Sequence, residues 1–183
     1  MSIATVAPGL TAGTWNIDPG HSEVTFVIRH LMTKVRGTFT EFTGAVQIAE
    51  ELSESTATAE IKMASLDTRN PDRDAHVRTS DVLDVEKYPT MAFTTTGVRT
   101  EGGEYYLDGD LTIKDVTRPL SLRVEFNGVG EDPWGGTRAG FSAEATINRK
   151  DWGIEFNIPI KGGEKALLSD KVDLQLEVQA VLA

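Results

Sequence analysis

Residues 104–126 read EYYLDGDLTIKDVTRPLSLRVEF and contain two runs in which apolar and polar side chains alternate. The apolar positions of the two runs are Tyr105, Leu107, Leu111, Ile113, Leu120, Leu122, Val124 and Phe126. Successive side chains of a strand point to opposite faces, so each run predicts a strand with one buried face and one solvated face. The short turn Lys114–Thr117 between them predicts an antiparallel hairpin.

The same alternation extends along most of the chain. It recurs in residues 24–29, 57–63, 139–148 and 172–180. One wet face and one dry face per strand are typical of antiparallel sheets. The sequence therefore predicts an all-β protein with a single domain over residues 14–183, preceded by a mobile segment at residues 1–13.

One predicted strand changes phase in its middle. Phe39 ends one alternating run, and Phe42 begins a run of the opposite phase. A bulge near Thr40 would return both aromatic side chains to the same face. Gly37 and Gly44 would let this long strand bend sharply, as the corner of a barrel requires.

A loop and one helix interrupt the strands. Residues 128–136 predict a long Gly-rich loop between two strands. Residues 70–72, Asn-Pro-Asp, predict the cap and first turn of a short helix near residues 71–80. In that helix Asp74 and Arg78 are four residues apart, and we expect them to form an ion pair on its surface.

Long strands with one dry face either close into a barrel or pack as two sheets. Several of the inward positions carry small side chains, namely Ala57, Ala59, Ala139, Ala143 and Ala145. Small inward side chains leave room, which an eight-stranded barrel can use to hold a ligand. The pattern favours the barrel, and a tightly packed sandwich remains the alternative.

Composition excludes several classes of function. The 183 residues include 28 acidic and 18 basic side chains, for a formal net charge of -10. This balance argues against a nucleic-acid surface, which needs clustered Lys and Arg. There is no cysteine, which excludes thiol catalysis, disulfides and Cys-ligated metals, and with only three histidines no metal centre is expected.

The start of the chain predicts a location. Residues 1–13 carry no Lys or Arg and no long apolar run, so we expect no secretory signal peptide. No uncharged stretch approaches the length of a transmembrane helix, so we expect no membrane span. These features predict a cytoplasmic protein.

Histidines give two candidate sites. His21 and Ser22 are adjacent, so in a strand they point to opposite faces, and the sequence has no Gly-x-Ser-x-Gly motif around a nucleophile. We therefore predict no catalytic serine. His30 is in phase with Phe26 and Ile28 and should face inward near a strand end. There it is either hydrogen-bonded in place or in contact with the polar head of a ligand at the mouth of a barrel.

Two further segments carry possible sites. Asp72, Asp74 and His76 are spaced by two and would share a face only in an extended segment, so in the predicted helix they diverge and we predict no metal site. Residues 149–170 are long and weakly patterned, as functional loops often are. Their apolar side chains predict either a flap over an apolar opening or a satellite packing cluster, and they are Trp152, Ile154, Phe156, Ile158, Leu167 and Leu168.

Four groups of residues, in order along the chain, resemble the YceI-like family. The first group is Trp15-x-x-Asp18-x-x-His21-Ser22, Phe26, Arg29-His30-Leu31-Met32 and Val35-Arg36-Gly37-x-Phe39. The second is Asp67-Thr68, Asn70, Arg73-Asp74-x-His76, Tyr88-Pro89 and Phe93. The third is Gly109-Asp110-Leu111-Thr112-Ile113-Lys114-x-Val116-Thr117-Arg118-Pro119. The fourth is Gly140-Phe141 with Ile147-x-Arg149-x-Asp151-x-Gly153.

This resemblance implies an antiparallel, lipocalin-like eight-stranded barrel that binds a long-chain isoprenoid or similar amphiphilic lipid without catalysis. It implies no cofactor besides this ligand, and we expect a possible homodimer. The alternatives are a stress-linked interaction protein and an enzyme that acts on a lipid-like substrate through His21 or His30 with Asp74. The expected ligand-binding residues are Phe26, Ile28, His30, Phe39, Phe42, Arg73, His76, Arg78, Phe93, Leu111, Phe141 and Trp152.

Overall fold

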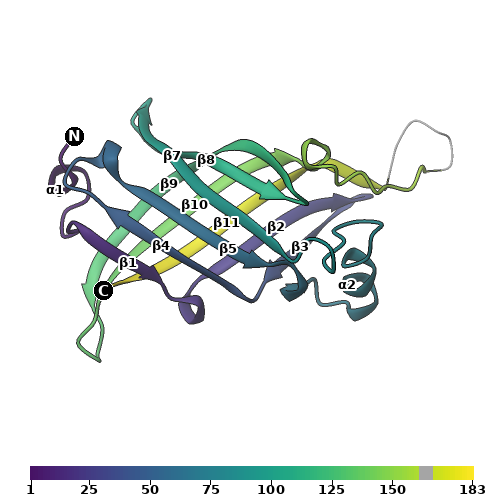
Figure 1. Cartoon of the computed structure of the whole chain (residues 1–183), viewed down its shortest axis with the longest axis horizontal. Helices are drawn as coiled ribbons and strands as arrows, with labels where there is room; N and C mark the ends of the chain where they lie inside the picture. Colours follow the sequence, from purple (N-terminus) through teal and green to yellow (C-terminus); the bar gives the residue numbers. More distant parts are fainter. Residues whose placement is uncertain (161–166) are drawn as a thin grey trace.

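The computed structural model of the chain describes residues 1–160 and 167–183, and its strands close into an antiparallel barrel (Figure 1). Around the barrel, neighbouring strands follow the order β1-β4-β5-β7-β8-β9-β10-β11, and β11 pairs again with β1. This closing pair confirms the eight-stranded barrel and excludes the sandwich. The strands are β1 (Gly13–Ile17), β2 (Glu23–His30), β3 (Thr33–Phe39), β4 (Phe42–Ile48), β5 (Thr56–Lys62), β6 (Leu66–Asp67), β7 (Thr90–Glu101), β8 (Glu104–Ile113), β9 (Val116–Glu131), β10 (Thr137–Asn148) and β11 (Leu168–Leu182).

At two places around the barrel, two strands that follow one another in the sequence share the position of a single strand. Both β1 and β2 pair with β11, and the short turn η1 (Pro19–His21) separates them. The next position is shared by β3, which pairs with β2, and β4, which pairs with β1. Strands β3 and β4 meet at Thr40 and Glu41, and Phe39 and Phe42 on either side are both buried. Both aromatic side chains are thus buried as predicted, but residues 40 and 41 separate two strands and do not form a bulge within one long strand.

The connections between strands agree with the sequence in one place and differ in another. Lys114 and Asp115 form the predicted turn between β8 and β9, and both have positive φ angles. The loop after β9 is shorter than predicted, because β9 continues to Glu131 and leaves only residues 132–136. Gly128 adopts a φ of 130° there, and the register shifts opposite it between Gly140 and Phe141, so a bulge carries the strand through the glycines.

The predicted helix is α2 (Pro71–Val77), which the side chain of Asn70 caps by accepting a hydrogen bond from the backbone of Arg73. The helix ends at Val77, three residues earlier than expected. The predicted surface ion pair between Asp74 and Arg78 is wrong. Asp74 is buried and accepts hydrogen bonds from Thr68 instead.

The two ends of the barrel are closed differently. The short helix α1 (Ile3–Val6) and both termini lie at one end, and α2 lies at the other (Figure 1). Ile3, Ala7 and Leu10 are buried in a cluster with Trp15, although the sequence predicted a mobile segment here. Mobility itself stays a prediction, but the segment packs against the barrel. No helix in the described ranges has the length and apolar character needed to cross a membrane.

Candidate functional site

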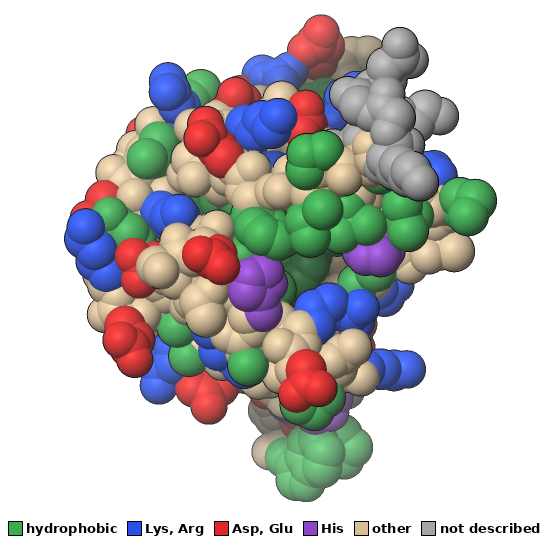
Figure 2. Space-filling model, turned by 90° about the vertical axis from the view of Figure 1, so that its right-hand side faces the viewer, with side chains coloured by type: hydrophobic (Ala, Val, Ile, Leu, Met, Phe, Trp, Pro, Cys, Tyr) green, Lys and Arg blue, Asp and Glu red, His purple; other side chains and the backbone are tan. Residues whose placement is uncertain are grey.

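A cavity with a volume of about 410 Å³ lies inside the α2 end of the barrel. Its walls combine the inward side chains of the strands at that end with residues of α2 and of the segment after β10. Figure 2 looks onto this end and shows hydrophobic side chains around a hollow. The apolar wall comprises Phe26, Ile28, Val35, Phe39, Met63, Leu66, Val77, Val82, Leu83, Met91, Ile113, Ile147, Val172 and Leu174. We call this space the upper cavity.

Polar side chains lie around the upper cavity, and three of them are His30, Arg73 and His76. The guanidinium of Arg73 donates from Nε to Oγ1 of Thr68 and from Nη2 to its carbonyl oxygen, both at 2.8 Å. The ring of His76 packs edge-on against Phe156, with 4.8 Å between the ring centroids. An amphiphilic ligand could therefore place an apolar chain in the cavity and a polar head among these groups.

Two buried polar contacts hold α2 in this position. The backbone N–H of Thr68 donates to Oδ1 of Asp74 at 3.0 Å, and the Thr68 hydroxyl donates to the same carboxylate. Buried polar groups are costly unless they are hydrogen-bonded, so these bonds fix the start of the helix to the end of β6. Arg73 and His76 lie on the same helix, so this contact also positions their side chains around the upper cavity. We call His30, Arg73 and His76 the polar rim.

Arg149 holds the segment that follows β10 against the upper cavity. It is only 3 % exposed, and its guanidinium donates to the carbonyl oxygens of Ser169, Ile154 and Phe156. Burial lowers the pKa of Arg149, and Asp170, at 4.0 Å from Nη2, opposes this shift. Among the described residues, Nη2 has no hydrogen-bond partner. The buried cation thus joins the start of β11 to the segment that follows β10.

This anchored segment contributes apolar side chains to the wall of the upper cavity, and its action as a flap stays a prediction. Its side chains that line the upper cavity are Ile154, Phe156, Ile158, Leu167 and Leu168. Trp152 does not line it: its indole N–H donates to the carbonyl of Leu111 at 2.9 Å, and the ring is buried in the core. Residues 161–166 of the predicted flap lie outside the described residues.

A second cavity of about 200 Å³ lies toward the α1 end, and we call it the lower cavity. Ile3, Val6 and Leu10 contribute to it from the N-terminal segment, and Phe93 and Phe141 contribute from the barrel. The sequence analysis did not identify α1 as part of any site. A helix of four residues carries almost no periodic signal, and only the closed barrel shows what covers its end.

Two phenylalanine rings that line the cavities each lie over a glycine of a neighbouring strand. A Cβ atom on Gly37 would overlap Cζ of Phe26 and lie 2.5 Å from its Cε1. A Cβ atom on Gly109 would lie 2.5 Å from Cζ of Phe93. Phe26 lines the upper cavity and Phe93 the lower one, and the described linings of the two cavities share no residue. The absence of a Cβ atom at each glycine leaves room for the ring.

The structure divides the expected ligand-binding residues into three groups. Those that line the upper cavity are Phe26, Ile28, His30, Phe39, Arg73 and His76. Phe93 and Phe141 line the lower cavity. Neither described lining includes Phe42, Leu111, Trp152 or Arg78. Phe42 and Leu111 pack in the core like Trp152, and Arg78 donates to the carbonyls of Ala64 and Leu66.

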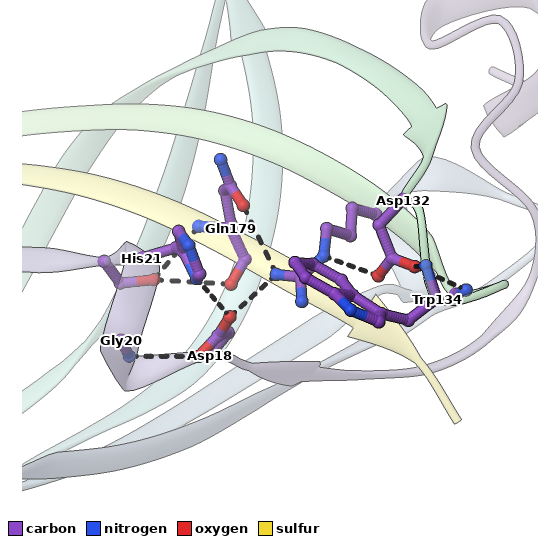
Figure 3. A network of polar contacts seen from close by, with 9 residues as sticks. Asp18, Gly20, His21, Asp132, Trp134 and Gln179 are labelled. Atoms are coloured by element: carbon purple, nitrogen blue, oxygen red, sulfur yellow. Dashed lines mark hydrogen bonds and ion pairs between the residues drawn. The ribbon is translucent and has the colours of Figure 1, made fainter.

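His21 and Ser22 belong to a separate polar network (Figure 3). Nδ1 of His21 lies 2.8 Å from Oδ2 of Asp18, and Arg138 donates to the same oxygen at 2.7 Å. These contacts lower the pKa of Asp18 to about 2, and the hydrogen bond from Arg138 has the largest effect. The hydroxyl of Ser22 donates to the carbonyl of Gln179, so it forms no nucleophile–base pair with His21. The network ties the β1–β2 junction to β10.

Metal binding has no support in the described part of the chain, where no group of three His, Asp or Glu side chains is placed to hold an ion. Asp72, Asp74 and His76 lie on α2, where the helical turn separates them as expected.

The barrel and its motifs match known proteins. The YceI-like domain matches residues 15–180. A UPF0312 protein of Photorhabdus laumondii is 42 % identical over 166 residues, which cover 88 % of this chain and 86 % of that protein. Two solved structures share the fold. BcnA of Burkholderia cenocepacia has a TM-score of 0.75 at 21 % identity over 89 % of this chain and 98 % of that one. A polyisoprenoid binding domain from Saccharophagus degradans, implicated in plant cell wall breakdown, has a TM-score of 0.68 at 13 % identity over 94 % and 100 %.

The family match covers all four groups of motif residues, from Trp15 to Gly153, and nearly all of the barrel. The relative from Photorhabdus laumondii matches over a similar share of the chain. Fold, motifs and sequence similarity therefore lead to one conclusion: the chain belongs to the YceI-like domain family.

Proposed function

We propose that the protein binds a long-chain isoprenoid or similar amphiphilic lipid inside the barrel and stores or transports it without catalysis. The observation that carries this proposal is the upper cavity, an apolar space of about 410 Å³ with His30, Arg73 and His76 among its lining residues. Cavities of this size are typical of small-molecule sites, and an apolar wall with a few polar groups favours an amphiphile.

The apolar wall supplies the main binding energy for such a ligand. Burial of one methylene group contributes about 0.8 kcal/mol, so one five-carbon isoprene unit contributes up to about 4 kcal/mol before the costs of binding are deducted. A few units in the upper cavity are therefore enough for stable binding. The rim then selects the head group, because cations and imidazoles favour a phosphate, carboxylate or carbonyl oxygen.

Family membership and the shared fold support the proposal. The domain from Saccharophagus degradans is a polyisoprenoid binding domain with the same barrel. The enzyme alternative has less support, because the Asp74 carboxylate is buried and bonded to Thr68 rather than paired with a histidine. A cytoplasmic location, a homodimer and the absence of a cofactor stay predictions.

Identification of the co-purifying lipid tests the proposal. Native mass spectrometry of the purified protein, followed by organic extraction, should reveal an adduct with a prenyl or comparable long chain. Leu174→Trp would fill part of the upper cavity and should reduce the adduct. Gln175→Trp is a matched control, because Gln175 is the next residue of β11 and is exposed on the outer face. A ligand-free protein with no affinity for prenyl chains, or equal loading of both variants, would contradict the proposal.

A further inference from the structure

The hairpin between β2 and β3 ends in two exposed apolar residues at the mouth of the upper cavity. Leu31 and Met32 form its two-residue turn, and they are 45 % and 87 % exposed. Such turns favour Gly, Asn or Asp, because at least one residue needs a positive φ. Leu31 adopts a φ of 52° without the help of any of these residue types. Apolar residues therefore do not stabilise this turn. Residues that disagree with the local structural preference in this way are expected at functional positions.

The same hairpin carries positive charge on a strongly acidic protein. Residues 24–40 contain Arg29, Lys34 and Arg36 and no acidic residue, whereas the whole chain has a net charge of -10. Among the described residues, Arg36 donates to the neutral side chain of Gln175, and the three cations take part in no ion pair. Within the part of the chain that the structure describes, the hairpin is thus a basic element whose charges form no ion pair.

Two of these cations lie directly opposite each other. Arg29 pairs with Lys34 in the β2–β3 register, so the two side chains stand side by side on the same face. Like charges in directly opposed positions destabilise a sheet. No ion pair among the described residues offsets this repulsion, whereas an external anionic surface would.

The turn is joined to the rim of the upper cavity through the backbone. The N–H of Leu31 donates to the carbonyl of Leu167, and the N–H of Leu167 donates to the carbonyl of Ile158, both at 2.9 Å. Ile158 is 50 % exposed and lines the cavity together with Leu167. Exposed apolar side chains therefore continue from the turn to the opening, and Figure 2 shows hydrophobic side chains from the hollow to the edge of this face.

We propose that this hairpin docks the mouth of the barrel on an anionic phospholipid surface, with Leu31, Met32 and Ile158 entering the interface and Arg29 and Lys34 facing the lipid phosphates. Apolar side chains flanked by cations are the combination that holds proteins at anionic membranes. The geometry directs the cavity opening toward the bilayer, so a long-chain ligand passes between the two without crossing water. The passage of a ligand between the barrel and the bilayer rests on the proposed function, whereas the docking of the hairpin does not.

Flotation with vesicles tests the docking separately from ligand binding. Vesicles of phosphatidylcholine with about a third phosphatidylglycerol should bind the protein, and pure phosphatidylcholine vesicles should bind it much more weakly. Each cation at such a surface contributes about fivefold to affinity, so Arg29→Gln with Lys34→Gln should lower binding by about 30-fold. Met32→Asp should lower it by at least about tenfold.

Matched variants control for net charge and for exposed apolar area. Thr5→Asp with Asn16→Asp makes the same change in net charge at exposed positions away from the hairpin. Trp134→Asp removes an 80 % exposed apolar side chain from the β9–β10 loop. Both controls should bind vesicles as the wild type does.

Affinity for a prenyl chain, measured without vesicles, should be unchanged in the hairpin variants. If the wild type does not bind a prenyl chain, the proposed function is refuted, but the docking result is unaffected. The docking proposal is overturned if the wild type does not bind anionic vesicles, or if the hairpin and control variants bind equally. It is also overturned if the hairpin residues hold two copies of the chain together in solution and the dimer does not bind vesicles.

Discussion

Substitution of Gly37 by alanine should force the Phe26 ring away from the barrel wall and into the upper cavity. The new Cβ would lie 2.5 Å and 3.0 Å from Cε1 and Cε2 of this ring, and it would overlap Cζ. Contacts shorter than 3 Å between carbon atoms are strongly repulsive, so the ring must move. The φ of Gly37 lies outside the positive range, which means that an alanine backbone is tolerated there.

The expected loss of stability is the difference between two effects. Overpacking of a filled site costs about 1–3 kcal/mol. Alanine in a strand gains about 0.5–1 kcal/mol over glycine, because the unfolded chain has less conformational freedom to lose. Gly37→Ala should therefore lower the free energy of unfolding by about 0–2.5 kcal/mol, which leaves the protein about 1–3 kcal/mol less stable than a glycine-to-alanine change without a clash would. Affinity for a prenyl ligand should fall by at least about tenfold, because the ring then occupies space equivalent to part of one isoprene unit.

Urea unfolding and ligand titration of four variants give the test. Gly97→Ala is the control, because a Cβ there meets no atom within 4 Å, and it should be neutral or slightly stabilising. Phe26→Leu and its combination with Gly37→Ala complete a double-mutant cycle, in which the smaller side chain should remove most of the penalty. The reasoning is refuted if Gly37→Ala is as stable as Gly97→Ala, or if Phe26→Leu does not rescue it.

Two further predictions concern the lower cavity and the polar network. Ala143→Leu should fill part of the lower cavity. In calorimetry, the affinity for chains long enough to reach that cavity should fall, whereas the affinity for chains confined to the upper cavity should be unchanged. Asp18→Asn should destabilise the protein by about 1 kcal/mol at pH 7, a modest value because Asp18 is partly exposed. The folded-state pKa of Asp18, about 2, is below its ordinary 3.8, so this contribution is complete above about pH 4 and is lost as the pH falls toward 2. Urea midpoints of wild type and Asp18→Asn should therefore converge in acid, and a constant difference down to pH 2 would contradict the assignment.

The strands were predictable from sequence because their signal is local. Alternation in residues 104–126 depends only on the two-residue repeat of a strand, and the turn at Lys114 and Asp115 needs only its own backbone angles. The cap of α2 is local for the same reason, since Asn70 bonds to a residue three positions ahead. These elements carry their structural information in a few consecutive residues.

The site was only partly predictable because its geometry depends on contacts distant in sequence. Whether Leu111 lines a cavity or packs in the core depends on Trp152, which bonds to its carbonyl from 41 residues away. Asp74 bonds to Thr68 and not to Arg78, because its buried carboxylate accepts hydrogen bonds from the backbone N–H that follows β6. Alternation indicates which side chains face inward, but not which of them border empty space.

Two glycines make room for phenylalanine rings beside the cavities. Gly37 leaves room for Phe26, which lines the upper cavity, and Gly109 leaves room for Phe93, which lines the lower cavity. A larger residue at either glycine should push the ring into the adjacent cavity and reduce the space for a chain there. Under the proposed function, a chain that extends from the upper into the lower cavity gains the burial of further methylene groups. The length of a co-purifying lipid would therefore show whether one cavity or both are used.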